Sequence, residues 1–145
     1  MLTIFKVECT EDHLRCLEVR RQVFVQEQGV ALDHEIEFEE ESTHFLVLQD
    51  QQPVATGRFR IIGQQVKFER IATLLKVRGH GIGKALIGKM IEVANQSYPN
   101  YNLIMNAQIT AKGFYEKLGW QAKGDTFDEA GIAHVQMVYP SKLCP

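Results

Sequence analysis

Residues 77–86 read Val-Arg-Gly-His-Gly-Ile-Gly-Lys-Ala-Leu, a glycine-rich and basic stretch that constrains the fold more than any other part of the chain. Residues 66–73 before it have the composition of a strand. Apolar residues follow it at helical spacing, namely Leu86, Ile87, Met90, Val93 and Ala94. A helix start leaves its first N–H groups unpaired and carries partial positive charge, which favours phosphate. The stretch therefore predicts a site for a nucleotide-like anion between a strand and a helix.

The spacing of the glycines separates the known kinds of phosphate loop. The dinucleotide pattern G-x-G-x-x-G is absent, because its third glycine would fall on Lys84 or Leu86. The mononucleotide P-loop is absent too, because Ala85 stands where Ser or Thr is required. What remains is R-x-x-G-x-G, from Arg78 to Gly83. In the alternative interpretation, the glycines only form a tight turn and the arginine is a solvated surface charge.

The size and composition predict one domain over residues 1–145. The chain has 145 residues, of which 45% are hydrophobic and 23% charged, the balance of an ordinary soluble domain. No apolar run approaches the roughly 18 residues that a membrane span needs, and the polar N-terminal residues do not resemble a secretory signal. We therefore expect a cytoplasmic protein without a membrane partner.

Charge and metal-ligand patterns narrow the function further. The net charge is −2 with dispersed basic residues, which argues against a nucleic-acid partner. Three cysteines without a C-x-x-C pair argue for reduced thiols. Five histidines show no H-E-x-x-H or other tight ligand spacing, so no metal is expected. The sequence leaves the oligomeric state open, a homodimer included.

The order of expected elements predicts a mixed α/β (α+β) sheet rather than a doubly wound one. Strands are expected at 2–7, 45–48, 54–62, 66–73, 101–106 and 132–139, the last following a turn at 128–131. Helices are expected after an N-cap at Thr10, with Leu14, Leu17, Val23 and Phe24 on its apolar side, after Gly83 as far as Tyr98-Pro99, and over 110–118 before Gly119. The strands at 45–48, 54–62 and 66–73 are joined by hairpins and should pair antiparallel.

A second motif runs from Asn106-Ala107-Gln108 through Ala111 to Phe114-Tyr115 and Gly119-Trp120. With the R-x-x-G-x-G loop it resembles the GNAT acetyltransferase superfamily, whose corresponding segment is N-x-x-A-x-x-F-Y-x-x-x-G-F. Gln108 and Trp120 stand where Asn and Phe are usual. Residues 20–30 and 128–134 further resemble the ElaA-like or YjcF-like branch.

The resemblance implies a GNAT fold, with a twisted, mostly antiparallel sheet that splays into a V and is flanked by helices. It implies transfer of an acetyl group from acetyl-CoA, as co-substrate, to a small-molecule amine by direct attack on the thioester. The implied cofactor contacts are the loop, the strand edge before it and two residues of the second motif: Arg78, Gly79, His80, Gly81, Ile82, Gly83, Lys84, Ile71, Ala72, Thr73, Gln108 and Phe114. The alternative is a GNAT-fold module that binds acyl-CoA or a protein partner without catalysis.

Such a transfer requires a base, because an ammonium with a pKa near 10 has no lone pair at pH 7. Glu69 is the candidate, since regular strand alternation would place its side chain on the same face as that of Ile71. The alternative is that Glu69 pairs with a neighbouring arginine and only orders its strand.

Departure of the thiolate requires a proton donor, and the resemblance gives that role to Tyr115. The alternative is that Phe114 and Tyr115 only pack their helix. His134 is a candidate base or acceptor contact, or else a structural histidine. Glu27 and Gln28 are candidate acceptor-site residues on resemblance alone.

Acidic residues cluster ahead of the first hairpin, at Asp33, Glu35, Glu37, Glu39, Glu40 and Glu41. They either attract a cationic amine or form a solvated face.

Overall fold

A computed structural model describes residues 1–29 and 37–140 of the chain. Its strands are β1 (Leu2–Lys6), β2 (Thr43–Gln49), β3 (Gln52–Ile62), β4 (Gln65–Thr73), β5 (Asn102–Gln108), β6 (Gln121–Glu129) and β7 (Ile132–Tyr139). Its α-helices are α1 (Thr10–Arg20), α3 (Ile82–Ser97) and α4 (Lys112–Lys117). Shorter helical segments are the π-helix η1 (Arg21–Glu27) and the 3-10 turns η2 (Leu75–Val77) and η3 (Ile109–Ala111).

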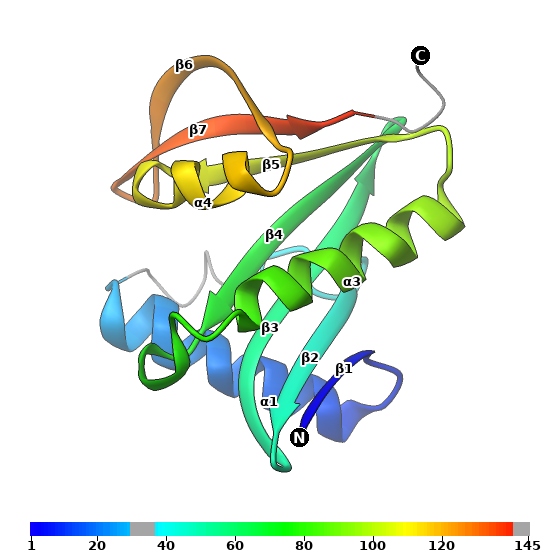
Figure 1. Ribbon diagram of the computed structural model, residues 1–145, viewed down its shortest axis with the longest axis vertical. Coiled ribbons are helices and arrows are strands. Elements are labelled where there is room, and N and C mark those ends of the chain that lie inside the picture. Colours follow the sequence, from blue (N-terminus) through cyan, green and yellow to red (C-terminus); the bar gives the residue numbers. More distant parts are fainter. Residues whose placement is uncertain (30–36, 141–145) are drawn as a thin grey trace.

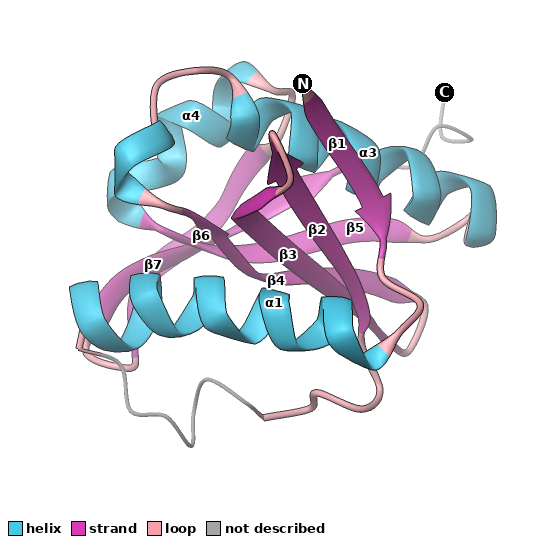
Figure 2. Cartoon of the chain, turned by 90° about the horizontal axis from the view of Figure 1, so that it is seen from below, coloured by secondary structure: helices cyan, strands magenta, loops and turns pink. Residues whose placement is uncertain are grey.

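The strands form one sheet in the order β1-β2-β3-β4-β5-β7-β6. All neighbours pair antiparallel except β4 and β5, which run parallel. The helix α1 lies along one face of the sheet, whereas α3 and α4 lie on the other (Figure 2). This arrangement confirms the mixed, mostly antiparallel sheet that the sequence predicted.

The parallel pair of strands separates along its length. Residues 65–68 of β4 pair with residues 102–105 of β5, and beyond them the two strands diverge into a V (Figure 1). The part of β4 from Glu69 to Thr73 therefore has no strand partner on its β5 side. This opening in the middle of the sheet provides the space for a ligand.

A β-bulge interrupts β4 where the V opens. Thr56 of β3 pairs with Ala72, and Arg58 pairs with Glu69. On β3, only Gly57 lies between Thr56 and Arg58. On β4, two residues, Arg70 and Ile71, lie between Glu69 and Ala72. Because Thr56 and Arg58 point to one face of the sheet, their partners Ala72 and Glu69 share that face as well.

The bulge overturns one step of the sequence analysis. Glu69 and Ile71 were expected on the same face, which holds only for a regular strand. Arg70 is the extra residue of the bulge, and its backbone has a left-handed conformation with φ of 53°. Ile71 instead lies beside Gly57, 3.4 Å from where a Cβ on that glycine would be, and so faces α3.

The core on the α3 side is continuous with the walls of the V. The buried side of α3 repeats at helical spacing, with Ile82, Leu86, Ile87, Met90 and Ala94. The Met90 sulfur lies 2.7 Å from where a Cβ on Gly57 would be, so a larger residue there would require the Met90 side chain to move. The packing fixes the start of α3 against the sheet.

The first helix differs from the expectation in two respects. Cys9, not Thr10, is the N-cap, and it makes no side-chain capping bond. Leu14 was expected on the apolar side but is 59% exposed. The helix also continues as the wider π-helix η1, which carries Val23 and Phe24 toward the opening of the V.

Candidate active site

The glycine-rich loop presents a row of unpaired backbone donors. Gly79 and Gly81 have φ of 86° and 79°, the left-handed region that favours glycine. The first helical bond of α3 runs from the N–H of Ala85 to the carbonyl of Gly81. Within residues 1–29 and 37–140, no N–H from Gly79 to Lys84 donates a hydrogen bond. A phosphate group can therefore accept several of them.

A cavity of about 870 Å³ extends from this loop through the opening of the V. Its walls come from the loop, from β3 to β7, from α4 and η1, and from the segment with Glu37 and Phe38. It brings together fifteen of the predicted site residues: Gln28, Glu69, Ile71, Ala72, Thr73, Arg78, Gly79, Gly81, Ile82, Gly83, Lys84, Gln108, Phe114, Tyr115 and His134. Glu27 and His80 do not line it, and His80 instead contacts the carbonyl of Val77 through Nδ1 at 3.0 Å.

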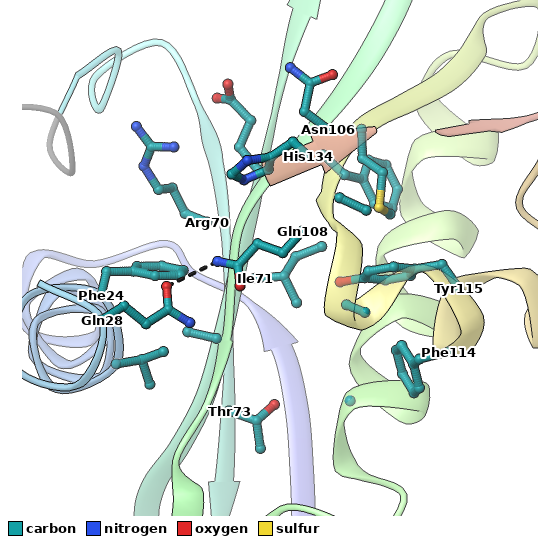
Figure 3. Close-up of a pocket in the computed structure, with 18 of the residues that line it drawn as sticks. Phe24, Gln28, Arg70, Ile71, Thr73, Asn106, Gln108, Phe114, Tyr115 and His134 are labelled. Carbon is teal, nitrogen blue, oxygen red and sulfur yellow. Dashed lines mark hydrogen bonds between the residues drawn. The ribbon is translucent and has the colours of Figure 1, made fainter. Parts of the chain in front are cut away.

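Tyr115 reaches the cavity from α4. Its side chain is 7% exposed and packs edge-on against Phe114 and Trp120, while its hydroxyl points into the cavity (Figure 3). Burial raises the pKa of the Tyr115 phenol above its usual value. In the described part of the chain the hydroxyl has no hydrogen-bond partner. It is therefore a protonated donor that is available to a ligand.

Two glutamines connect β5 to the end of η1. The side-chain amide of Gln108, at the end of β5, donates to the side-chain amide oxygen of Gln28 at 2.9 Å (Figure 3). These residues are 80 positions apart in the sequence. The contact brings the end of η1 to the edge of β5, beside His134, which pairs with Gln108 across β5 and β7.

His134 lies buried at the end of the cavity away from the glycine-rich loop. Its Nδ1 lies 2.6 Å from the carbonyl oxygen of Ile132, and its ring stacks on Phe127. Its Nε2 lies 3.6 Å from a carboxylate oxygen of Glu129. The other oxygen of Glu129 accepts a hydrogen bond from the Asn106 amide.

Comparisons with known proteins agree with this geometry. Residues 8–140 match the family model for the acetyltransferase (GNAT) domain. The chain belongs to the GNAT acetyltransferase family.

Bacillus subtilis YyaT is 37% identical over 141 residues, which is 94% of each chain. The Bacillus subtilis N-acetyltransferase YjcF is 40% identical over 122 residues, 83% of this chain and 86% of YjcF. Escherichia coli ElaA shares the fold, with a TM-score of 0.85, 20% identity, and coverage of 97% of this chain and all of ElaA.

The protein is thus an acyltransferase, and acyl-CoA is its co-substrate. The GNAT fold and the ElaA-like or YjcF-like branch inferred from the motifs are confirmed. The loop with its free donors, the open edge of β4 and the cavity between them fit the diphosphate and the extended arm of such a molecule. No helix within the described ranges is long and apolar enough to span a membrane.

Arg78 of the GNAT loop binds protein groups on both sides. Its guanidinium forms two hydrogen bonds of 2.8 Å with the Glu27 carboxylate, and its Nε donates to the carbonyl of Thr73 at 2.8 Å. Glu27, predicted to line the acceptor site, is therefore placed beside the cofactor loop instead. The ion pair ties the end of η1, and with it Gln28, to the loop.

Glu69 is enclosed by cations. Its carboxylate accepts hydrogen bonds from Arg58 at 3.0 Å and Arg60 at 2.9 Å, and Lys67 lies 3.3 Å away. Burial acts to raise its pKa, but these three cations outweigh it and lower the pKa below its usual value. The contacts match the alternative in which this carboxylate orders the strand.

Glu39 forms a second buried network, which no sequence motif signalled. Its carboxylate binds the guanidinium groups of Arg20 and Arg58, which are 1% and 0% exposed, and the imidazole of His13. Burial opposes ionisation, yet the hydrogen bonds and charges of these neighbours lower the pKa of Glu39 from 4.5 to about 2. Of the acidic cluster considered for amine attraction, Asp33 and Glu35 lie outside the described residues, whereas Glu39 holds buried arginines.

His13, Glu39 and His44 bring their ligand atoms within 4.8 Å of one another, a grouping that the sequence spacing did not reveal. Both oxygens of Glu39 already accept hydrogen bonds from arginine. A divalent cation here would have two guanidinium groups as neighbours, which opposes its binding. The grouping is better described as part of the Glu39 network.

Proposed function

We propose that this acyltransferase transfers an acetyl group from acetyl-CoA to the amine of a small molecule. The observation that carries the proposal is one continuous cavity with free main-chain donors at one end and His134 at the other. The Tyr115 hydroxyl lies along its wall between these ends (Figure 3). A thioester held by the loop at its diphosphate would extend along β4 toward this hydroxyl.

The cofactor end is proposed to act through the main chain. The N–H groups from Gly79 to Lys84 would bind the diphosphate. The edge of β4 at Ile71-Ala72-Thr73, where the Thr73 carbonyl already accepts a hydrogen bond from Arg78, would bind the amides of the pantetheine arm. Each hydrogen bond to a charged group contributes about 1.5–3 kcal/mol. Because backbone groups would make these contacts, the side chains at these positions are free to vary. A threonine at position 73 is compatible with such a site.

The transfer is proposed to proceed by direct attack. The neutral amine forms a bond to the thioester carbon, the C–S bond breaks, and the sulfur leaves as a thiolate. Tyr115 donates its proton to that sulfur, because its buried phenol is neutral and its hydroxyl is free. No enzyme nucleophile is required. Glu69, with three cations around it, is a weak base, and we assign it the ordering of β4.

The proposal is tested by thiol release from acetyl-CoA with a panel of primary amines and polyamines. We expect turnover with at least one amine. We also expect CoA at 100 times its dissociation constant to stabilise the protein by about 2.7 kcal/mol, a melting shift of roughly 5–10 °C. Stabilisation without any turnover would indicate a binding module, and no stabilisation would overturn the proposal.

The matched variant Tyr115→Phe removes only the hydroxyl. We expect its kcat to fall about 100-fold, the scale of general acid catalysis, because the thiolate loses its proton donor. The melting shift with CoA should remain, since the diphosphate contacts are distant from the hydroxyl. Unchanged turnover in this variant would remove Tyr115 from the mechanism.

A further inference from the structure

We propose that His134 is the general base that removes the proton from the acceptor amine. The inference rests on the proposed function, because it gives a role within that reaction. The evidence is the position of the His134 ring, which lines the end of the cavity away from the cofactor loop. The ring contacts the carbonyl of Ile132 and the ring of Phe127.

The ring has a defined tautomer. A carbonyl oxygen only accepts hydrogen bonds, so the 2.6 Å contact between Nδ1 and Ile132 places the proton of the neutral ring on Nδ1. Nε2, on the far side of the ring from this bond, then carries the lone pair. Phe127 stacks on the ring, with 6.1 Å between the ring centroids. A base with a fixed and accessible lone pair is what proton removal requires.

A carboxylate stands where the protonated ring would need it. Glu129 lies 3.6 Å from Nε2, too far for a hydrogen bond to the neutral ring but close enough to stabilise an imidazolium. Asn106 holds this carboxylate by donating to its second oxygen. Asn106 and Glu129 thus place a carboxylate beside the ring nitrogen that would receive the proton of the amine.

The other charged groups of the cavity are less suited to this step. Besides His134, the charged residues that line the cavity are Glu37, Arg60, Lys67, Glu69, Arg70, Arg78, Lys84 and Glu129. Glu69 is held by Arg58, Arg60 and Lys67 and lies on the face of β4 opposite Ile71. The five arginines and lysines that line the cavity are positively charged and cannot act as a base. Glu37 is exposed to solvent, whereas His134 is buried in the wall of the cavity, which favours His134 for this step.

The overall transfer from an ammonium releases one proton. His134 takes one proton from the ammonium and passes it to solvent, and the free amine attacks the thioester carbon. The nitrogen of the resulting adduct then gives its second proton to Nε2 of His134. The C–S bond breaks as Tyr115 protonates the sulfur, and the tyrosine regains a proton from His134 through water. The products are the amide, the free thiol and one proton.

The test compares His134→Gln with wild type in the pH dependence of kcat, using acetyl-CoA and the amine that wild type uses best. We expect kcat to fall about 100-fold and the decline of kcat on the acidic side to disappear. The KM for acetyl-CoA and the melting shift with CoA should stay the same. Imidazole in the medium should partly restore turnover to His134→Ala.

The control is Glu92→Gln, which changes an exposed titratable residue of α3 that does not line this cavity. This variant should keep the wild-type kcat and the same decline of kcat on the acidic side. An undiminished kcat or an unchanged acidic decline in His134→Gln would overturn the role of His134 while leaving the proposed function intact. Absence of turnover in wild type would instead remove the proposed function, and this role with it.

A second measurement needs no variant. Nitrogen chemical shifts of the His134 ring in the wild-type protein at pH 8 should show the proton on Nδ1 and none on Nε2. The opposite tautomer, or a doubly protonated ring at that pH, would contradict the inference.

Discussion

The two ends of the cavity are built from different parts of the chain. The proposed cofactor end is a single segment, Gly79–Lys84, whose main-chain N–H groups make no hydrogen bonds among the described residues. The acceptor end collects side chains from β3, β4, β6 and β7 and from the segment that carries Glu37 and Phe38. A contiguous main-chain site depends on glycine spacing, whereas the dispersed site depends on the tertiary fold.

This difference has a functional consequence. Main-chain donors would bind a diphosphate whatever side chains surround them, so the proposed cofactor end suits a co-substrate that is common to the family. The acceptor end rests on ion pairs between neighbouring strands, and a single substitution there alters both charge and shape. Stability and acceptor choice should therefore respond to acceptor-end substitutions, and acyl-CoA binding to cofactor-end changes.

The largest effect is expected for Glu39→Gln. Removing one partner of a buried ion pair costs about 3–5 kcal/mol, because Arg20 and Arg58 stay buried with less compensation. Urea unfolding should show a loss of this size in the free energy of unfolding. Glu40→Gln is the control, since Glu40 is an exposed neighbour on the same segment. A loss below about 1 kcal/mol would mean that the network is not a support for the acceptor end.

The same carboxylate predicts a pH dependence. Its pKa of about 2 in the folded protein lies below the ordinary 4.5, so the folded state binds fewer protons than the unfolded state. Its contribution to stability is complete above about pH 4.5 and is lost as the pH falls toward 2. Glu39→Gln should flatten the stability curve in this window, and an equally steep loss in the variant would contradict the assignment.

A smaller effect is expected on ligand affinity. The binding free energy of CoA should be more favourable than that of pantetheine by about 3 kcal/mol. Pantetheine lacks the diphosphate, and the loss of two charge-assisted hydrogen bonds at about 1.5 kcal/mol each weakens binding more than 100-fold. Calorimetric titration of CoA, phosphopantetheine and pantetheine should rank them in that order. Equal affinities would show that the loop donors do not bind phosphate.

The glycine-rich loop and the helix after it could be predicted from the sequence because their determinants are local. The spacing of Gly79, Gly81 and Gly83 and the apolar repeat of α3 each depend on a few consecutive residues. The bulge at Arg70 was not foreseen, since it depends on how β3 and β4 pair, and it reversed the expected side of Glu69. The Glu39 network and the Gln28 to Gln108 contact join residues far apart in sequence, and no periodicity signals such contacts.

The smallest effect is expected at the link between the two ends, the ion pair of Arg78 and Glu27. Both side chains are about one-third exposed, at 37% and 35%, so Glu27→Gln should cost less than about 1 kcal/mol in stability. Because the pair holds Gln28 near Gln108, its loss should raise the amine KM about threefold. Arg78, released from a carboxylate, should bind CoA at least as tightly as before.

The matched control for this substitution is Glu18→Gln, which breaks an exposed ion pair with Arg21 on the helix α1 and its continuation. It should leave the amine KM and the dissociation constant of CoA unchanged. Weaker CoA binding in Glu27→Gln would mean that this carboxylate orients Arg78 toward the diphosphate. The two ends of the cavity would then share one charged residue pair, and the separation between a main-chain cofactor end and a side-chain acceptor end would fail at that point.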